Sequence, residues 1–274
     1  EQYKFFHYEL EFIEVFRERN GFDVAVGNPP WINIELDEAG IVSEYNPEVY
    51  VRKMSAPEVK KIALKLLEKN EELKAVYFDE NIWAEATKEF LGGVQNYYYL
   101  QGQRNNLYKC ILNNSLLIIN ENGFVGLVHP EGIYDDPSGQ EFRKFIYPRL
   151  KYHFQFKNEL LLFSEVHHEM FYGIHIYSGK AGEINFININ NLFHPSTIDG
   201  SLIHSGNGSV GGLKIKNEQT ERMEWNTLPH KNRVARITKQ ELDIIAKTFE
   251  NNTTGEATKL VGIHSVEIIN IFRT

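Results

Sequence analysis

The chain has 274 residues, with 29 lysines and arginines against 37 aspartates and glutamates, so its formal net charge is −8. A single cysteine excludes a disulfide framework and a cysteine-rich zinc site. No apolar run approaches ~18 residues, so the sequence predicts no transmembrane helix, and the first residues lack the basic region of a signal peptide. The acidic balance argues against a protein that coats nucleic acid by bulk charge alone.

The charge is unevenly distributed along the chain. Residues 201–274 hold 10 basic and 8 acidic residues, a net of +2, so residues 1–200 carry a net of −10. A mildly basic segment after an acidic body is a weak indication of contact with a polyanion. An uneven but merely solvated surface explains the same pattern equally well.

Alternating helices and buried strands predict an α/β sheet. The run 22–27 has no regular polar alternation and ends in glycine, which is typical of a strand buried on both faces, as in a parallel sheet. Pro29 and Pro30 then end that strand. In chain order, the patterns predict helix 8–19, strand 22–27 and a mostly helical region 33–100, which has a capping box at 55–58 and a helix over 81–91. They then predict helix 105–120, a turn at Asn122-Gly123, strand 124–128, helix 140–147, and strands 152–156, 171–177 and 183–189.

The sequence changes in character near residue 195, where we place a domain boundary. Residues 205–212 are rich in glycine but lack the Gly-Lys-Ser/Thr ending of a phosphate-binding loop, so they are interpreted as a flexible loop. A capping box at 238–241 predicts one further helix.

The candidate catalytic segment is Asn28-Pro29-Pro30-Trp31, directly after the first predicted strand. Open α/β sheets bind their ligands at the carboxyl ends of their strands. An asparagine oxygen and a backbone carbonyl can together accept two hydrogen bonds from one amino group, and an indole can stack on a planar ring. The alternative interpretation is an ordinary loop in which Asn28 is a turn residue and Trp31 fills the core.

This segment resembles motif IV of amino-methyltransferases that use S-adenosylmethionine, in particular the bacterial N6-adenine DNA methyltransferases of restriction-modification and phage-defence systems. The resemblance extends over most of the chain, although only the motif IV block is specific. The residues that carry it are Asp23 to Trp31, Asn106-Leu107-Tyr108, Glu121 to Pro130, Phe163-Ser164-Glu165-Val166-His167 (similar to motif VIII), and Trp225, Pro229-His230 and Arg233 to Ile237.

The resemblance implies roles for individual residues. Asn28 and the Pro29 carbonyl would hold the adenine amino group, Pro30 would keep the turn extended, and Trp31 would stack on the flipped base. His167 stands where relatives often have a second stacking aromatic. An equally good alternative is that residues 167–169 form a polar entrance to the next strand, and their spacing predicts no metal site.

The same resemblance implies the organisation of the chain. Residues 1–195 would be the C-terminal half of a Rossmann-like methyltransferase sheet with a helical insertion at 33–100, and 196–274 would be a mixed α+β start of a target-recognition region. Only 27 residues precede Asn28, and they contain no Gly-x-Gly turn. We therefore expect a fragment of a longer polypeptide that lacks the main S-adenosylmethionine-binding motif.

The expected activity is methyl transfer to the N6 amine of adenine in double-stranded DNA, in the bacterial cytoplasm and without a membrane partner. Lys231, Arg233 and Arg236 are the candidate DNA contacts in the basic segment. The alternatives are a methyltransferase acting on RNA or a protein amide, and a non-catalytic DNA-binding or scaffold module.

Overall fold

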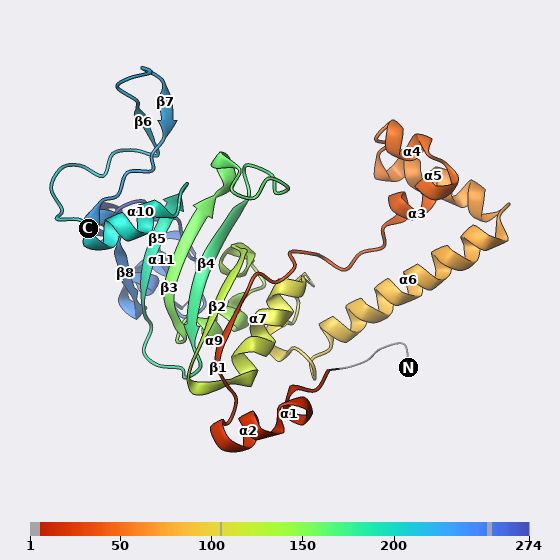
Figure 1. Cartoon of the computed structure of the whole chain (residues 1–274), viewed down its shortest axis with the longest axis horizontal. Helices are drawn as coiled ribbons and strands as arrows, with labels where there is room; N and C mark the ends of the chain where they lie inside the picture. Colours follow the sequence, from red (N-terminus) through yellow and green to blue (C-terminus); the bar gives the residue numbers. More distant parts are fainter. Residues whose placement is uncertain (1–5, 105, 251–253, 274) are drawn as a thin grey trace. The chain divides into compact units, whose positions relative to one another are not determined.

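A computed structural model describes residues 6–104, 106–250 and 254–273. The chain divides into two compact units, drawn in Figure 1 and described here separately. Unit 1 consists of Glu1–Trp31 and Tyr108–Thr274, and unit 2 consists of Ile32–Leu107. Asn105, where a helix was predicted to begin, lies outside the described residues. None of the described helices is long and apolar enough to cross a membrane.

Unit 1 is built on a six-stranded mixed sheet with the order β1-β2-β4-β3-β5-β8. Strands β1, β2, β3 and β5 run parallel to one another, and β4 and β8 run in the opposite direction. The strands are β1 Phe22–Gly27, β2 Ile119–Pro130, β3 Leu150–Lys157, β4 Phe171–Ser178, β5 Asn185–Leu192 and β8 Ala235–Thr238. A separate hairpin pairs β6 Lys214–Lys216 with β7 Met223–Trp225.

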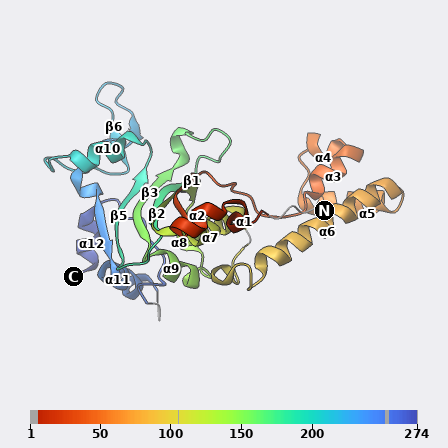
Figure 2. The ribbon, with the colours of Figure 1, turned by 60° about the horizontal axis from the view of Figure 1, so that its bottom comes forward.

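The two faces of this sheet differ in cover. On one face, Val125 and Leu127 are buried and the rings of β2 to β4 pack against Tyr108 and Tyr134 from helices. Figure 2 shows helices along the sheet, and the helix that contains Ile198 packs on the other face, against Phe156 and Leu192. The helices of unit 1 are α1 Tyr8–Glu11, α2 Ile13–Arg19, α7 Leu107–Ile118, α8 Gly132–Asp135, α9 Gln140–Ile146, α10 Ser196–Ile203, α11 Lys239–Phe249 and α12 Val266–Phe272, with 3-10 turns η2 Asn158–Leu160 and η3 Lys231–Arg233.

Unit 2 is helical around a small core of its own. Val42, Val49, Val59 and Ala63 are buried together there. The predicted capping box between Ser55 and Glu58 is present and begins α5. The elements of unit 2 are α3 Glu38–Tyr45, α4 Glu48–Val51, α5 Ala56–Leu67, α6 Glu71–Gly92 and the 3-10 turn η1 Tyr98–Leu100.

The structure corrects three predicted elements. The helix over 8–19 breaks at Phe12, whose ring packs edge-on against Phe22 with centroids 5.2 Å apart. The helix over 81–91 begins ten residues earlier, because Asn70 caps its first turn by accepting from the Leu73 N–H. Strand β2 starts before the predicted 124–128 and runs through Asn122-Gly123, where its register with β1 is irregular.

The other predicted strands of the sheet and the capping box at Thr238 and Glu241 are confirmed. The expectation that strand 22–27 is buried on both faces is wrong, because β1 is an edge strand of the described sheet and its Val24 and Val26 are 60% and 80% exposed. Strand β8 lies beyond residue 195 and pairs with β5 in the same sheet. The domain boundary near 195 stays a prediction.

Candidate functional site

The first predicted site lies at one edge of the sheet. The parallel strands β1 and β3 end at this edge, so the segment Asn28 to Trp31 and the loop 158–170 both start there. A hollow of about 420 Å³ lies between the two segments and is lined by residues 28–31 and 162–166. Ligands of open α/β sheets bind at this position. The structure therefore brings the motif IV residues together with the motif VIII segment.

The asparagine of this site is placed to accept hydrogen bonds. Asn28 is exposed and lines the hollow, whereas Pro29 beside it is buried. Strand β1 ends at Gly27, because the two prolines that follow Asn28 cannot continue the ladder. Among the described residues, no partner forms a hydrogen bond with the Asn28 carboxamide.

The indole of Trp31 is half-buried on the wall of the hollow. Its ring packs against Tyr172 and Phe163 with centroids 5.7 Å and 5.4 Å apart, and its Nε1 donates to the Val128 carbonyl at 3.3 Å. Burial raises the pKa of Tyr172 to about 12, so that hydroxyl stays protonated at neutral pH. These contacts fix the indole plane relative to the ends of β2 and β4.

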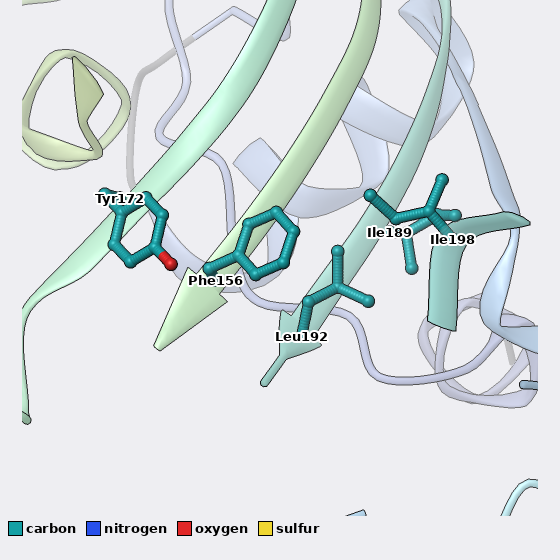
Figure 3. Close-up of a cluster of buried hydrophobic side chains, with 5 residues drawn as sticks. All are labelled: Phe156, Tyr172, Ile189, Leu192 and Ile198. Atoms are coloured by element: carbon teal, nitrogen blue, oxygen red, sulfur yellow. The ribbon is translucent and has the colours of Figure 1, made fainter. Parts of the chain in front are cut away.

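The floor beneath Trp31 is a buried apolar cluster that links the central strands. Phe156 and Tyr172 stack with their planes 9° apart, and Trp31 and Phe163 pack against the same cluster. Figure 3 shows that these side chains come from neighbouring strands and from α10. The cluster consists of Phe156, Tyr172, Ile189, Leu192 and Ile198.

The loop opposite Trp31 is shaped by one buried asparagine. Asn158 is fully buried, and its Nδ2 donates to the carbonyls of Phe163 and Val166 at 2.8 Å and 2.7 Å. Its Oδ1 accepts from the Phe163 N–H at 3.1 Å. These three hydrogen bonds hold Phe163 at the hollow, since both backbone groups of that residue are tied to one side chain.

The comparison with known families decides what kind of protein this is. Residues 1–160 match the family described as Eco57I restriction-modification methylase. The chain belongs to this family. The family is one of methyltransferases from restriction-modification systems, and the mixed α/β sheet of this chain is consistent with a methyltransferase-like fold.

Two solved structures are similar to parts of this chain. One is an ATP-dependent type ISP restriction-modification enzyme, LlaBIII, bound to DNA, with 13% identity over 65% of this chain and a TM-score of 0.33. The other is the type IIG restriction endonuclease BpuSI, with 18% identity over 54% of this chain and a TM-score of 0.31. The chain spans 11% and 16% of the lengths of these two proteins. No curated protein matches it.

His167, the predicted second stacking residue, does not line the hollow. His167 is exposed and lines a separate cleft with Glu131, Glu169 and other residues, away from the segment that begins at Asn28. Phe163 lines the hollow instead. It is the one aromatic residue besides the histidines in the loop 158–170, and that signal could have identified it from the sequence.

The three candidate DNA contacts differ in exposure. Lys231 and Arg236 are exposed, and Arg236 also donates to the Asn185 side-chain oxygen at 2.8 Å. Arg233 is fully buried, and burial lowers its pKa to about 10, so it is still charged at neutral pH. Its guanidinium donates to the carbonyls of Asn191, Asn226 and Leu228.

The expectation that Arg233 contacts DNA is therefore corrected. The protein encloses its guanidinium. Both Nη atoms donate to backbone carbonyls, and the Nε is buried without a partner among the described residues, so a phosphate cannot reach the group. The sequence showed a positive charge but not its burial. Lys231 and Arg236 stay as predicted contacts.

The glycine-rich segment 205–212 does not have the setting of a turn that binds a nucleotide-like cofactor. The glycine-rich segment 205–212 has positive φ angles at Gly206, Gly208 and Gly211, but it follows α10 and leads to β6. Glycine-rich turns that bind such cofactors connect a strand to a helix. The segment is a loop, as predicted, and it lacks that setting.

Proposed function

We propose that this chain is the methyl-acceptor part of an S-adenosylmethionine-dependent enzyme that methylates the N6 amine of adenine in DNA, within a restriction-modification system. The observation that carries the proposal is the hollow in which Asn28 is exposed beside the rings of Trp31 and Phe163. Polar acceptors beside an aromatic wall suit a flat base with an exocyclic amine.

The roles of the residues follow from this arrangement. Asn28 Oδ1 and the Pro29 carbonyl would accept the two N–H groups of the target amine, which keeps the nitrogen lone pair out of conjugation with the ring. Trp31 would stack on the base, which must leave the helix stack to enter the hollow. S-adenosylmethionine supplies the methyl group when it is bound. Catalysis then depends on positioning and lone-pair alignment rather than on a covalent enzyme intermediate.

We also propose that the main cofactor-binding motif belongs to the remainder of a longer polypeptide. The sheet face that carries Val26 supports this outside the part that α10 covers, because Val26, Phe124 and Tyr152 on it are 80%, 47% and 41% exposed. Strand β1 is at the edge of the sheet order, so one side of it has no strand among the described residues. An apolar face beside an open strand edge is typical of a surface that further structure covers.

The test is single-turnover methylation by the full-length enzyme, on duplex DNA and, as rivals, on RNA and on a glutamine-containing peptide. Asn28→Ala should lower the rate of methyl transfer to duplex DNA about 100-fold or more, because one positioned acceptor contributes on the order of 3 kcal/mol in the transition state. DNA binding and the melting temperature should stay close to the wild-type values.

Asn270→Ala is the matched control, since Asn270 is an exposed asparagine in α12. It should leave the rate unchanged. A well-folded Asn28→Ala enzyme with near-normal turnover would contradict the assignment. Methylation of RNA or peptide in preference to DNA would replace the proposed substrate, and DNA binding without any methylation would support a scaffold.

A further inference from the structure

Three side chains of types that commonly bind metal ions converge inside unit 1, on the covered face of the sheet. Glu131 follows β2, and His153 in β3 is paired across the strands with His175 in β4. His153 Nε2 lies 2.9 Å from Glu131 Oε2, and His175 Nε2 lies 3.0 Å from Glu131 Oε1. Both imidazoles are fully buried. The proposed methyl transfer uses none of the three.

A chain of hydrogen bonds determines which nitrogen of His153 carries a proton. The Ile263 N–H donates to Asn190 Oδ1 at 3.2 Å, so that atom is an acceptor. Asn188 donates to the same oxygen with its Nδ2, which leaves Asn188 Oδ1 facing His153 Nδ1 at 2.6 Å. His153 Nδ1 must therefore donate, and Nε2 is the nitrogen aimed at Glu131.

This arrangement is typical of a metal-ligating histidine. Such a histidine usually donates its other ring N–H to a carbonyl or carboxylate, which sets the tautomer and the ring orientation. Gln155 Nε2 also donates to Glu131 Oε2 at 3.2 Å, so the carboxylate has an orienting partner of its own.

The backbone of β4 approaches the cluster closely at Gly173. A Cβ built on Gly173 would lie 2.5 Å from His175 Nε2 and 2.6 Å from Glu131 Oε1. Any side chain at this position would therefore occupy the space in which the two groups meet. Glu131 and Gln155 also line the large cleft of unit 1, which provides a route for a small ion from solvent.

We propose that Glu131, His153 and His175 bind one divalent first-row transition metal ion, such as Zn²⁺, through a carboxylate oxygen and the two Nε2 atoms. The ligand atoms all lie within 4.8 Å of one another. A tetrahedral ion with bonds near 2.1 Å separates its ligands by about 3.4 Å, so small shifts would admit it. Two imidazoles and a carboxylate suit zinc and its neighbours. The ion would connect β2, β3 and β4, and the proposal does not depend on the methylated substrate.

The rival occupant is a proton. If no metal binds, a proton between His153 Nε2 and Glu131 Oε2 joins the two side chains in a buried ion pair. Glu131, His153 and His175 lie far apart in the chain and form no short motif, so the sequence alone does not indicate this site.

The experiment measures zinc in the full-length protein by elemental analysis after purification, and by calorimetric titration of the chelator-treated protein with ZnCl₂. We expect one zinc ion per chain. Glu131→Gln and His175→Gln should each lower the zinc affinity by about 100-fold or more, and Asn188→Ala by roughly 10–100-fold, the range for an outer-shell partner. The control is the His167→Ala/His168→Ala double variant, which removes two exposed histidines and should bind zinc as the wild type does.

Thermal melts show whether each variant folds. If a variant of a buried residue does not fold, zinc binding by the wild-type protein tests the proposal by itself. Co²⁺ bound in place of zinc should add visible d–d absorption to the wild-type protein. Wild-type protein that binds neither ion would overturn the proposal in favour of the ion pair. Zinc binding lost in the double variant but kept in Glu131→Gln would overturn it in favour of an adventitious surface site.

Discussion

Trp31 and Phe163 face each other with ring centroids 5.4 Å apart and planes inclined by 59°. Trp31 follows β1 and Phe163 comes from the loop between β3 and β4, so the contact closes the candidate base pocket from two distant parts of the chain. Because the two rings touch, a base can enter between them only if the loop 158–170 moves away from Trp31. Trp31 is held from below by Tyr172, so we expect the loop to be the part that moves.

Substitution of Trp31 separates its two roles. Trp31→Ala should weaken capture of the flipped base by roughly 1–3 kcal/mol, because stacking contributes that much per base. It should also lower the melting temperature, since the indole packs on Tyr172 and donates to the Val128 carbonyl. Trp31→Phe should retain much of the methylation rate, because it keeps an aromatic face.

Single-turnover rates beside thermal melts measure both effects. If Trp31 only fills the core, methylation by the two variants will fall in step with the folded fraction. That outcome would remove the stacking role.

Phe163 and His167 belong to the same loop, so substituting each in turn tests which of them forms the second aromatic wall of the hollow. Phe163→Ala should reduce methylation of duplex DNA, because Phe163 lines the hollow with Asn28. His167→Ala should leave methylation near the wild-type rate, because His167 lines a different cleft. Single-turnover rates for both variants provide the measurement. A loss confined to His167→Ala would restore the assignment made from the sequence.

The buried Arg233 should contribute to stability, whereas the exposed Lys231 and Arg236 should contribute to DNA binding. Arg233→Ala should destabilise the fold by about 1–3 kcal/mol, because three backbone carbonyls lose their donor. Lys231→Ala and Arg236→Ala should each change stability by less than about 0.5 kcal/mol. If both exposed residues contact phosphates, each substitution should reduce the log–log salt slope of DNA binding by about 0.9. An unchanged slope would mean that these two residues only interact within the protein.

The capping box of α11 should make stability depend on pH. Burial raises the pKa of Glu241. Its hydrogen bonds with Thr238 and Arg273 lower that pKa by more than burial raises it, so the net shift is downward. A carboxyl whose pKa is lower in the folded state adds stability above its unfolded pKa of about 4.3 and loses it as the pH falls through the folded pKa.

Glu241→Gln should therefore melt at a lower temperature than the wild type at pH 7. The difference should shrink as the pH falls below about 4. Thermal melts of both proteins from pH 7 to pH 3 measure this, and a constant difference over that range would contradict the role of the charge.

Local patterns in the sequence determined the elements whose signals are short-range. The strand 22–27 and its end at Pro29 and Pro30 follow from apolar runs and proline chemistry, and both are present. The capping boxes at Ser55 and Thr238 were predictable for the same reason, because a cap needs only residues three positions apart. The helix over 8–19 was not, since a contact between Phe12 and Phe22 overrides its periodicity.

Only the tertiary structure decided which side chains meet. The order β1-β2-β4-β3-β5-β8 places the loop after β3 beside Trp31 and selects Phe163 rather than His167. The same order brings Glu131, His153 and His175 within hydrogen-bonding distance, although 44 positions separate the first from the last. It also encloses Arg233. Strand order and cross-strand register depend on long-range packing, which local periodicity does not encode.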